Sequence, residues 1–184
     1  MSGFKVRAVR KGDWSALEEL FGRAGASNGC WCQYWLLGPE YHRRDRQLNR
    51  AALARQVRRE HSPGLLAYSD GAAVGWARFT PRSQLRYVLD RFKGYDFPDD
   101  DARVLSCFFT ARASRGQGVM SALIEHAVTQ GNEHGYAVEG YPIDPSAPGA
   151  TRNRFPGVLP AFLEHGFFEV GRLAADRAVV RTKS

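Results

Sequence analysis

Alternating and helix-periodic apolar residues divide the chain into short strands and helices. The stretch 4–9 alternates like a strand, and Asp13 follows as a candidate N-cap for a helix with Leu17, Leu20 and Phe21 on one side. Apolar runs at 65–68 and 73–79 flank an Asp-Gly pair, which tolerates positive φ and so predicts an antiparallel hairpin. Further strands are expected at 104–110, 137–141, 167–170 and 178–181, and helices at 40–60, 118–134 and 159–165.

Two segments interrupt this pattern. The stretch 22–39 combines glycines with a dense aromatic group around Trp31 and Trp35, and we interpret it as a loop. The stretch 81–101 is mostly polar, and Pro98 is followed by three aspartates, so we expect a surface loop with a short helix at 87–92.

Composition and length favour one folded domain spanning residues 1–184. The chain is 43% hydrophobic and 12% aromatic, which is too apolar for a disordered protein. Apolar runs nowhere approach the roughly 18 residues of a membrane span. The N-terminus lacks the apolar core of a secretion signal, so we expect a cytoplasmic protein with no membrane partner.

Three cysteines, Cys30, Cys32 and Cys107, cannot all pair with one another, and we expect reduced thiols. The C-x-C spacing of the first two is not that of a zinc site, so no metal is expected. Cys107 falls in an apolar strand, where a thiol is usually inert core.

The formal net charge of +7 attracts phosphate-bearing ligands and nucleic acid alike. Much of this charge lies in the basic segment 42–59, whose Ala51, Leu53 and Val57 give it an apolar side. We therefore expect an amphipathic helix packed on the sheet with its arginines outward, and RNA binding by that face stays an alternative.

The run Arg115-Gly116-Gln117-Gly118-Val119 joins a predicted strand to a predicted helix. Free backbone N–H groups at a helix N-terminus, glycines that permit close approach and an arginine together suit a pyrophosphate. The third glycine of a dinucleotide motif is Ser121 here, and no Walker lysine follows. The competing interpretation is that the glycines only permit a tight connection.

Together with Cys107-Phe108-Phe109-Thr110 and Glu164-His165-Gly166-Phe167, this run resembles the GNAT superfamily of N-acetyltransferases. The segments 29–35, 75–76 and 138–142 are similar to a bacterial branch of it with a CWCxYW segment and an EGYP strand. The resemblance implies an α/β fold in which a mixed, V-shaped sheet is flanked by helices. Acetyl-CoA would lie where the strands at 104–110 and 137–141 part.

By that resemblance, residues Phe108, Phe109 and Thr110 would hold the pantetheine arm. The pyrophosphate would lie on the turn formed by Arg115, Gly116, Gln117, Gly118, Val119, Met120 and Ser121. Two positions depart from the family pattern: Met120 replaces a small residue, and Phe162 replaces a tyrosine. Since phenylalanine has no phenol, it cannot protonate the leaving thiolate from that position.

Acyl transfer to an amine needs a general base, and Glu139, on the strand that borders the expected split, is our first candidate. Tyr141 shares its face of the strand and is a candidate acid or orienting hydroxyl. The alternative for Glu139 is a salt-bridged strand residue. The acceptor pocket is assigned to large aromatic side chains, namely Trp31, Tyr34, Trp35 and Trp76.

The predicted function is transfer of an acetyl or short acyl group from acyl-CoA to a primary amine by direct attack in a ternary complex. Small-molecule amines, protein amines and aminoacyl-tRNA all remain open as acceptors, and a monomer and a homodimer remain open as assemblies. The alternative is a non-catalytic module that binds RNA or a protein through its basic helix.

Overall fold

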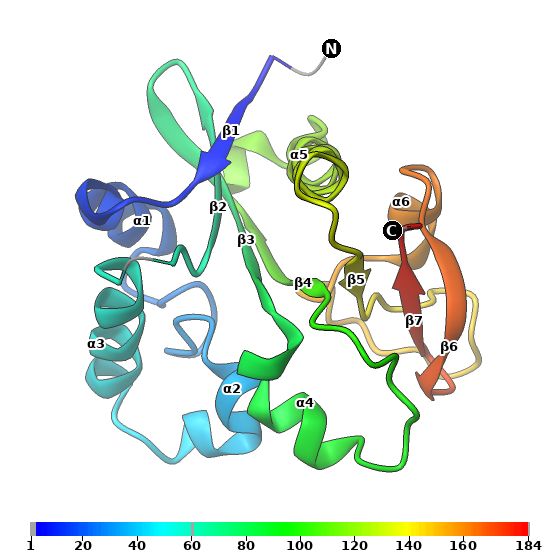
Figure 1. The fold of residues 1–184 in the computed structure, drawn as a ribbon. Coiled ribbons are helices and arrows are strands. Elements are labelled where there is room, and N and C mark those ends of the chain that lie inside the picture. The colour runs from blue at the N-terminus through cyan, green and yellow to red at the C-terminus, as the bar shows by residue number, and fades with distance from the viewer. Residues whose placement is uncertain (1–2, 60, 184) are drawn as a thin grey trace.

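The computed structural model describes residues 3–59 and 61–183, and Figure 1 shows how their strands and helices are arranged. The strands are β1 (Lys5–Ala8), β2 (Gly64–Ser69), β3 (Ala72–Pro81), β4 (Arg103–Thr110), β5 (Val138–Gly140), β6 (Phe168–Ala174) and β7 (Arg177–Arg181). The helices are α1 (Trp14–Phe21), α2 (Tyr34–Leu37), α3 (Arg46–Val57), α4 (Arg86–Arg91), α5 (Val119–His134) and α6 (Leu159–Leu163). The predicted α/β class is confirmed.

All seven strands form one mixed sheet in the order β1-β2-β3-β4-β5-β7-β6. Neighbours pair antiparallel except β4 and β5, which run parallel and pair over three residues each, 103–105 with 138–140. Beyond Leu105 the two strands part, and Figure 1 shows β1 to β4 separated from β5, β7 and β6 below α5. The V-shaped sheet implied by the resemblance is therefore present.

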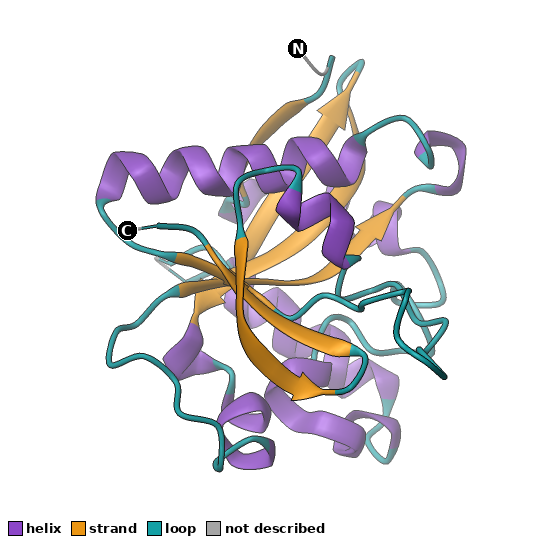
Figure 2. Ribbon diagram, turned by 90° about the vertical axis from the view of Figure 1, so that its right-hand side faces the viewer, coloured by secondary structure: helices purple, strands orange, loops and turns teal. Residues whose placement is uncertain are grey.

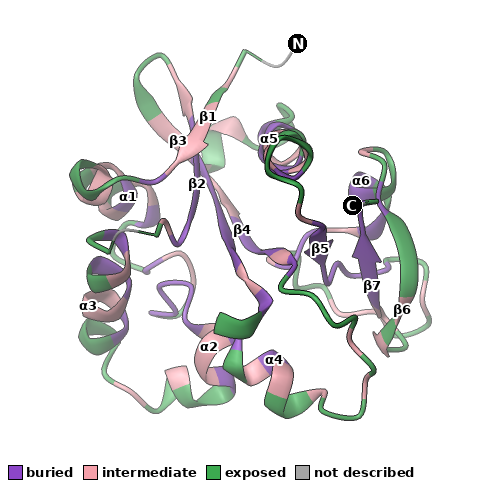
Figure 3. Cartoon of the chain, viewed as in Figure 1, coloured by how far each residue is buried: buried purple, intermediate pink, exposed green. Residues whose placement is uncertain are grey.

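Helices cover both faces of the sheet (Figure 2). On one face α5 packs Leu123, Ile124 and Ala127 against apolar residues of β2, β3 and β4, and α6 adds Phe162 to the same core. On the other face α1 and α3 contribute Leu17 and Leu53 to a second core with residues of β2 to β4. Figure 3 shows β5 and β7 buried, while β6 and the outer side of α5 are exposed.

Residues with positive φ form the turn of the β2–β3 hairpin and the two ends of helix α5. The β2–β3 hairpin turns through Asp70 and Gly71, whose φ values are 49° and 82°, as the Asp-Gly pair predicts. Helix α5 begins after Gly118 and ends at Gly135, both in the left-handed conformation that glycine adopts without strain.

Two predicted segments differ from the structure. The aromatic stretch expected to be a loop contains α2, which was not predicted. The helix expected at 40–60 is instead a 3₁₀ turn at Gly38–His42 followed by α3. Helix α3 begins only after Asp45, because the Asp45 carboxylate caps its N-terminus by accepting a hydrogen bond from the Gln47 N–H at 2.8 Å. Its expected last residue, Glu60, lies outside the described residues. Among the described residues, the helices are all too short or too polar to cross a membrane.

Candidate functional site

A pocket of about 790 Å³ opens beside the outer end of β4. Five parts of the chain line it: Cys107 to Thr110 of β4, Arg115 and Met120 around the start of α5, the segment between α1 and α3, the loop at 152–156, and Arg177 of β7. The residues of the pocket therefore come from far apart in the sequence, and a volume of this size suits a small-molecule ligand.

At the floor of the pocket, β4 contains a β-bulge. The register with β3 shifts between Ala77 and Arg78, and Cys107 adopts a φ of 55°. The backbone N–H of Phe108, just after the bulge, points away from β3 and donates to the carbonyl of Phe155 at 2.6 Å. Gly157 continues this segment and accepts from the Ile143 N–H at 3.0 Å, so residues 155–157 bridge the gap between β4 and the end of β5.

The glycine turn before α5 has the open geometry that its sequence predicts. Gly116 and Gly118 have φ values of 73° and 85°, and a Cβ at either position would meet no heavy atom within 4 Å. Val119 is buried in the core, whereas Arg115 is exposed and, with Met120, reaches the pocket. Gln117 is tied to the preceding turn through the Ala113 carbonyl at 2.9 Å, and Ser121 lies in the first turn of α5.

The pocket is electropositive. Its described lining contains Arg115, Arg152, Arg154 and Arg177 and no carboxylate. The guanidinium of Arg177 lies 5.4 Å from the ring centre of Trp35, and burial lowers the pKa of this arginine. Such a lining favours anionic ligands.

Of the four aromatic residues assigned to an acceptor pocket, Tyr34 and Trp35 line it. Trp31 and Trp76 are buried behind it, and the indole N–H of Trp76 donates to the Cys32 sulfur at 2.9 Å. Two of the four predicted side chains therefore lie at the pocket wall, and the other two lie in the core that supports the wall.

Two further pocket residues, Tyr41 and His42, were not among the candidate catalytic or acceptor-binding residues predicted from the sequence. Their rings lie 3.8 Å apart, and the backbone carbonyl of Tyr41 accepts from the buried amide of Asn49 at 3.0 Å. Burial raises the pKa of Tyr41, and the neighbouring Cys30 and Cys107 raise it further. The sequence shows no periodic pattern around these two residues that would point to a site, because both lie in a short 3₁₀ turn.

The three cysteines are free and buried, and all three line the pocket. Burial raises the pKa of Cys32, but the hydrogen bond with Cys107, the charge of Arg78 and the indole N–H of Trp76 outweigh it, so the pKa is lowered. Burial and the neighbouring Cys32 raise the pKa of Cys30 to about 11. Cys107, which the sequence assigned to inert core, is therefore buried but also belongs to the pocket wall, as do Cys30 and Cys32.

Glu139 and Tyr141, the predicted catalytic pair, are not among the pocket-lining residues. The Glu139 side chain is 0% exposed and accepts from Arg82 at 2.8 Å and from Arg181 at 2.7 Å. The Tyr141 hydroxyl donates to the same carboxylate at 2.5 Å, and both arginines also contact Asp100.

This arrangement favours the salt-bridged alternative for Glu139. Its carboxylate is fully buried, is held by two guanidinium groups and a phenol, and lies outside the described lining of the pocket where an amine would bind. In the structure Glu139 is a salt-bridged strand residue, paired with Arg82 and Arg181.

Phe162 is also fully buried. Its ring packs edge-on against Phe108 at 5.9 Å between centres and against Phe167 at 5.0 Å. The residue at the family's tyrosine position therefore forms the wall behind β4. No cluster of three or more histidine, cysteine, aspartate or glutamate side chains fit to hold a metal ion occurs in the part of the chain that the structure describes.

The sheet that splits between β4 and β5, with a glycine turn leading into a long helix, is the architecture of an acyl-CoA N-acyltransferase. The model of the acetyltransferase (GNAT) family matches residues 27–140, which is more than half of the chain, and the chain belongs to this family. A search of curated proteins finds no match.

Solved structures share the whole fold at low sequence identity. The PaiA N-acetyltransferase of Thermoplasma acidophilum in complex with coenzyme A is 12% identical, with a TM-score of 0.58 over 98% of this chain and 99% of that one. A GNAT-family acetyltransferase of Listeria monocytogenes is 17% identical, with a TM-score of 0.60 over 98% and 95%. The ribosomal-protein-alanine N-acetyltransferase of Brucella melitensis is 17% identical, with a TM-score of 0.57 over 98% and 99%.

Proposed function

We propose that this chain transfers an acetyl or another short acyl group from acyl-CoA to a primary amine in the pocket beside β4. The observation that carries the proposal is the continuity of this pocket. It runs from Arg115, beside the open glycine turn, past the bulge at Cys107 to the aromatic wall of Tyr34 and Trp35. A donor and an acceptor can therefore meet at the bulge within one cavity.

The donor's phosphates are assigned to the glycine turn, from Arg115 to Ser121. Backbone N–H groups at the start of α5 are free there, and the helix dipole favours an anion. Arg115, Arg152 and Arg154 add positive charge to the lining of the same pocket. The pantetheine arm is assigned to Phe108, Phe109 and Thr110, which requires Phe155 to release the Phe108 N–H.

In the reaction, the amine nitrogen attacks the thioester carbonyl carbon, a C–N bond forms, and the C–S bond breaks to release the CoA thiolate. The amine must lose a proton and the thiolate must gain one. We assign the acid to Tyr41, because its phenol lines the pocket and is protonated at neutral pH, as tyrosine ordinarily is. We assign the base to His42, because it is the imidazole among the described lining residues, and imidazole is the side chain most often used for proton transfer.

Replacing Tyr41 tests this assignment. Tyr41→Phe should lower kcat by about 10² to 10⁴, the usual contribution of a positioned acid, with little change in KM for acetyl-CoA. Release of CoA is measured against a panel of small amines, peptides and aminoacyl-tRNA, which also identifies the acceptor class.

Tyr34→Phe is the matched control, since Tyr34 lines the same pocket and its ring lies 6.1 Å from that of Tyr41. Equal losses in both variants would mean that the pocket needs aromatic hydroxyls only for binding. Phe162→Tyr is a second control: if Tyr41 is the acid, restoring the family's phenol should leave kcat unchanged. A large gain would mean that the natural protein lacks an acid.

A second candidate function is a non-catalytic module that binds RNA or a protein. It is favoured by the missing phenol at Phe162 and by Arg55, Arg58 and Arg59, which are all exposed at the end of α3. Turnover with any amine in the panel excludes this candidate, whereas acetyl-CoA binding without turnover supports it.

A further inference from the structure

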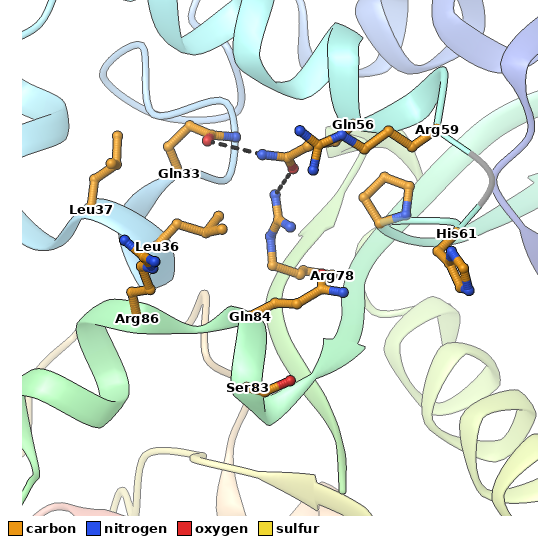
Figure 4. A pocket seen from close by; sticks show the side chains of 11 residues that line it. Gln33, Leu36, Leu37, Gln56, Arg59, His61, Arg78, Ser83, Gln84 and Arg86 are labelled. Carbon is orange, nitrogen blue, oxygen red and sulfur yellow. Dashed lines mark hydrogen bonds between the residues drawn. The ribbon is translucent and has the colours of Figure 1, made fainter. Parts of the chain in front are cut away.

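A second pocket, of about 590 Å³, lies below α3 between α2 and the end of β3, and Figure 4 shows its lining. It shares no lining residue with the pocket beside β4. The backbone of Cys32 and Gln33 separates them, since Cys32 lines the first pocket and Gln33 the second. The proposed acyl transfer therefore leaves this second pocket unexplained.

Arg78 lies at the centre of this second pocket and is 1% exposed. Its Nε donates to the Cys32 carbonyl at 3.1 Å and its Nη2 to Oε1 of Gln56 at 3.0 Å. Both partners are neutral, and no carboxylate within ion-pair distance is found among the described residues. Burial lowers the pKa of Arg78, whereas the nearby thiols of Cys32, Cys107 and Cys30 act in the opposite direction, and an arginine keeps its charge in proteins.

A buried charge without a counter-ion is costly, because its attraction to water is lost and no ion pair replaces it. The other charged residues of the described lining have the same sign. Arg59 and Arg86 reach the rim from opposite sides (Figure 4). The pocket therefore concentrates positive potential around one buried guanidinium.

The remaining walls define the kind of anion. Leu36, Leu37 and Pro63 supply apolar surface, while Gln33 and Gln84 supply neutral hydrogen-bonding groups. A few polar groups within an apolar wall, in a volume of this size, are typical of a site for a small organic molecule.

We infer that this second pocket binds a small organic anion, whose carboxylate or phosphate group pairs with Arg78 and Arg86 and whose apolar part lies against Leu36, Leu37 and Pro63. This inference does not depend on the proposed acyl transfer. The binding it describes is measured without acetyl-CoA.

Isothermal titration calorimetry at constant ionic strength, with benzoate, phenyl phosphate and benzamide as probes, tests the inference. Benzoate and phenyl phosphate should bind, and benzamide, which has the same ring without the charge, should bind at least about tenfold more weakly. Arg86→Gln should weaken the anions by about tenfold, because one charge-assisted hydrogen bond is removed. Arg78→Gln should abolish binding if its circular dichroism spectrum shows a folded protein.

Two control variants locate the site. Arg55→Gln removes an exposed arginine of α3 that does not line the second pocket, and Arg115→Gln removes a charge from the pocket beside β4. Both variants should bind benzoate and phenyl phosphate with the affinity of the parent. The inference is overturned if benzamide binds as well as benzoate, if Arg55→Gln weakens the anions as much as Arg86→Gln, or if Arg115→Gln alone removes binding.

Discussion

Removing the charge of Glu139 should destabilise the protein rather than disable its chemistry. The carboxylate lies on β5, where it pairs in register with Val104 of β4 and Arg181 of β7. It joins the two halves of the sheet, since Arg82 follows β3 and Arg181 belongs to β7. Glu139→Gln keeps the shape of the side chain and removes the charge that both arginines share.

Breaking a buried ion pair by removing one partner costs about 3 to 5 kcal/mol, because the remaining charge stays buried without compensation. Asp100 still contacts both arginines in the variant, so we expect the lower end, about 3 kcal/mol. For a domain of this size each kcal/mol lowers the Tm by about 2 to 4 °C, which predicts a decrease of about 6 to 12 °C.

Urea unfolding at 25 °C and a thermal melt measure the effect, with Glu164→Gln as the control. Glu164 is exposed and forms no ion pair with the described residues, so its variant should melt within about 2 °C of the parent. Turnover of Glu139→Gln, measured well below its Tm, should stay within a few-fold of the parent. Parental stability combined with a large loss of turnover would refute this reasoning and return Glu139 to the role of general base.

Three further predictions concern the glycine turn, the Arg7–Asp13 ion pair and the end of α3. Acetyl-CoA should raise the Tm of the parent and of Gly71→Val but not that of Gly118→Val; both glycines have φ above 80°, so strain alone would affect the two variants alike. Arg7 hydrogen-bonds Asp13 and lowers its pKa to about 2, so the stabilisation is complete above about pH 4 and is lost as the pH falls from about 4 to 2. Urea unfolding of Asp13→Asn should therefore show a weaker pH dependence than the parent in that window, and equal slopes would contradict the assignment. If RNA binds the end of α3, fluorescence anisotropy should show an affinity that falls steeply with salt, and Arg55→Gln, Arg58→Gln and Arg59→Gln together should flatten that slope; salt-independent binding would point elsewhere.

The elements that follow local rules could be predicted from the sequence. The β2–β3 hairpin depends on Asp70 and Gly71, and α5 depends on its apolar face and on Gly135, all of which are signals within a few neighbouring residues. Helix α2 was missed because four residues are too few to show helical periodicity, and aromatic side chains do not favour a helix by themselves. The start of α3 was missed because a basic run was interpreted as one helix although Asp45 offered a cap within it.

The glycine turn was found for the same local reason, whereas the catalytic assignment depended on tertiary contacts. The sequence shows only that Glu139 is a carboxylate on a predicted strand next to the expected split in the sheet. Its character is decided by Arg82 and Arg181, which lie 57 and 42 residues away in the chain and show no pattern that relates them to it. A strand of three residues gives no alternation from which to decide which face the carboxylate occupies.

The same contrast gives the buried arginines of this protein two different roles. Along the sequence, Arg78, Arg82 and Arg181 are equivalent basic residues in or beside β-strands. In the fold, Arg82 and Arg181 meet the carboxylates of Glu139 and Asp100, whereas Arg78 meets only neutral groups among the described residues. Where the chain supplies the counter-ion, a buried arginine contributes to stability; where it supplies none, the unmet charge is available to a ligand. Replacing one residue from each setting should therefore separate the two roles. Arg82→Gln should lower the Tm, whereas Arg86→Gln, at the exposed rim of the pocket around Arg78, should lower anion affinity and leave the Tm unchanged.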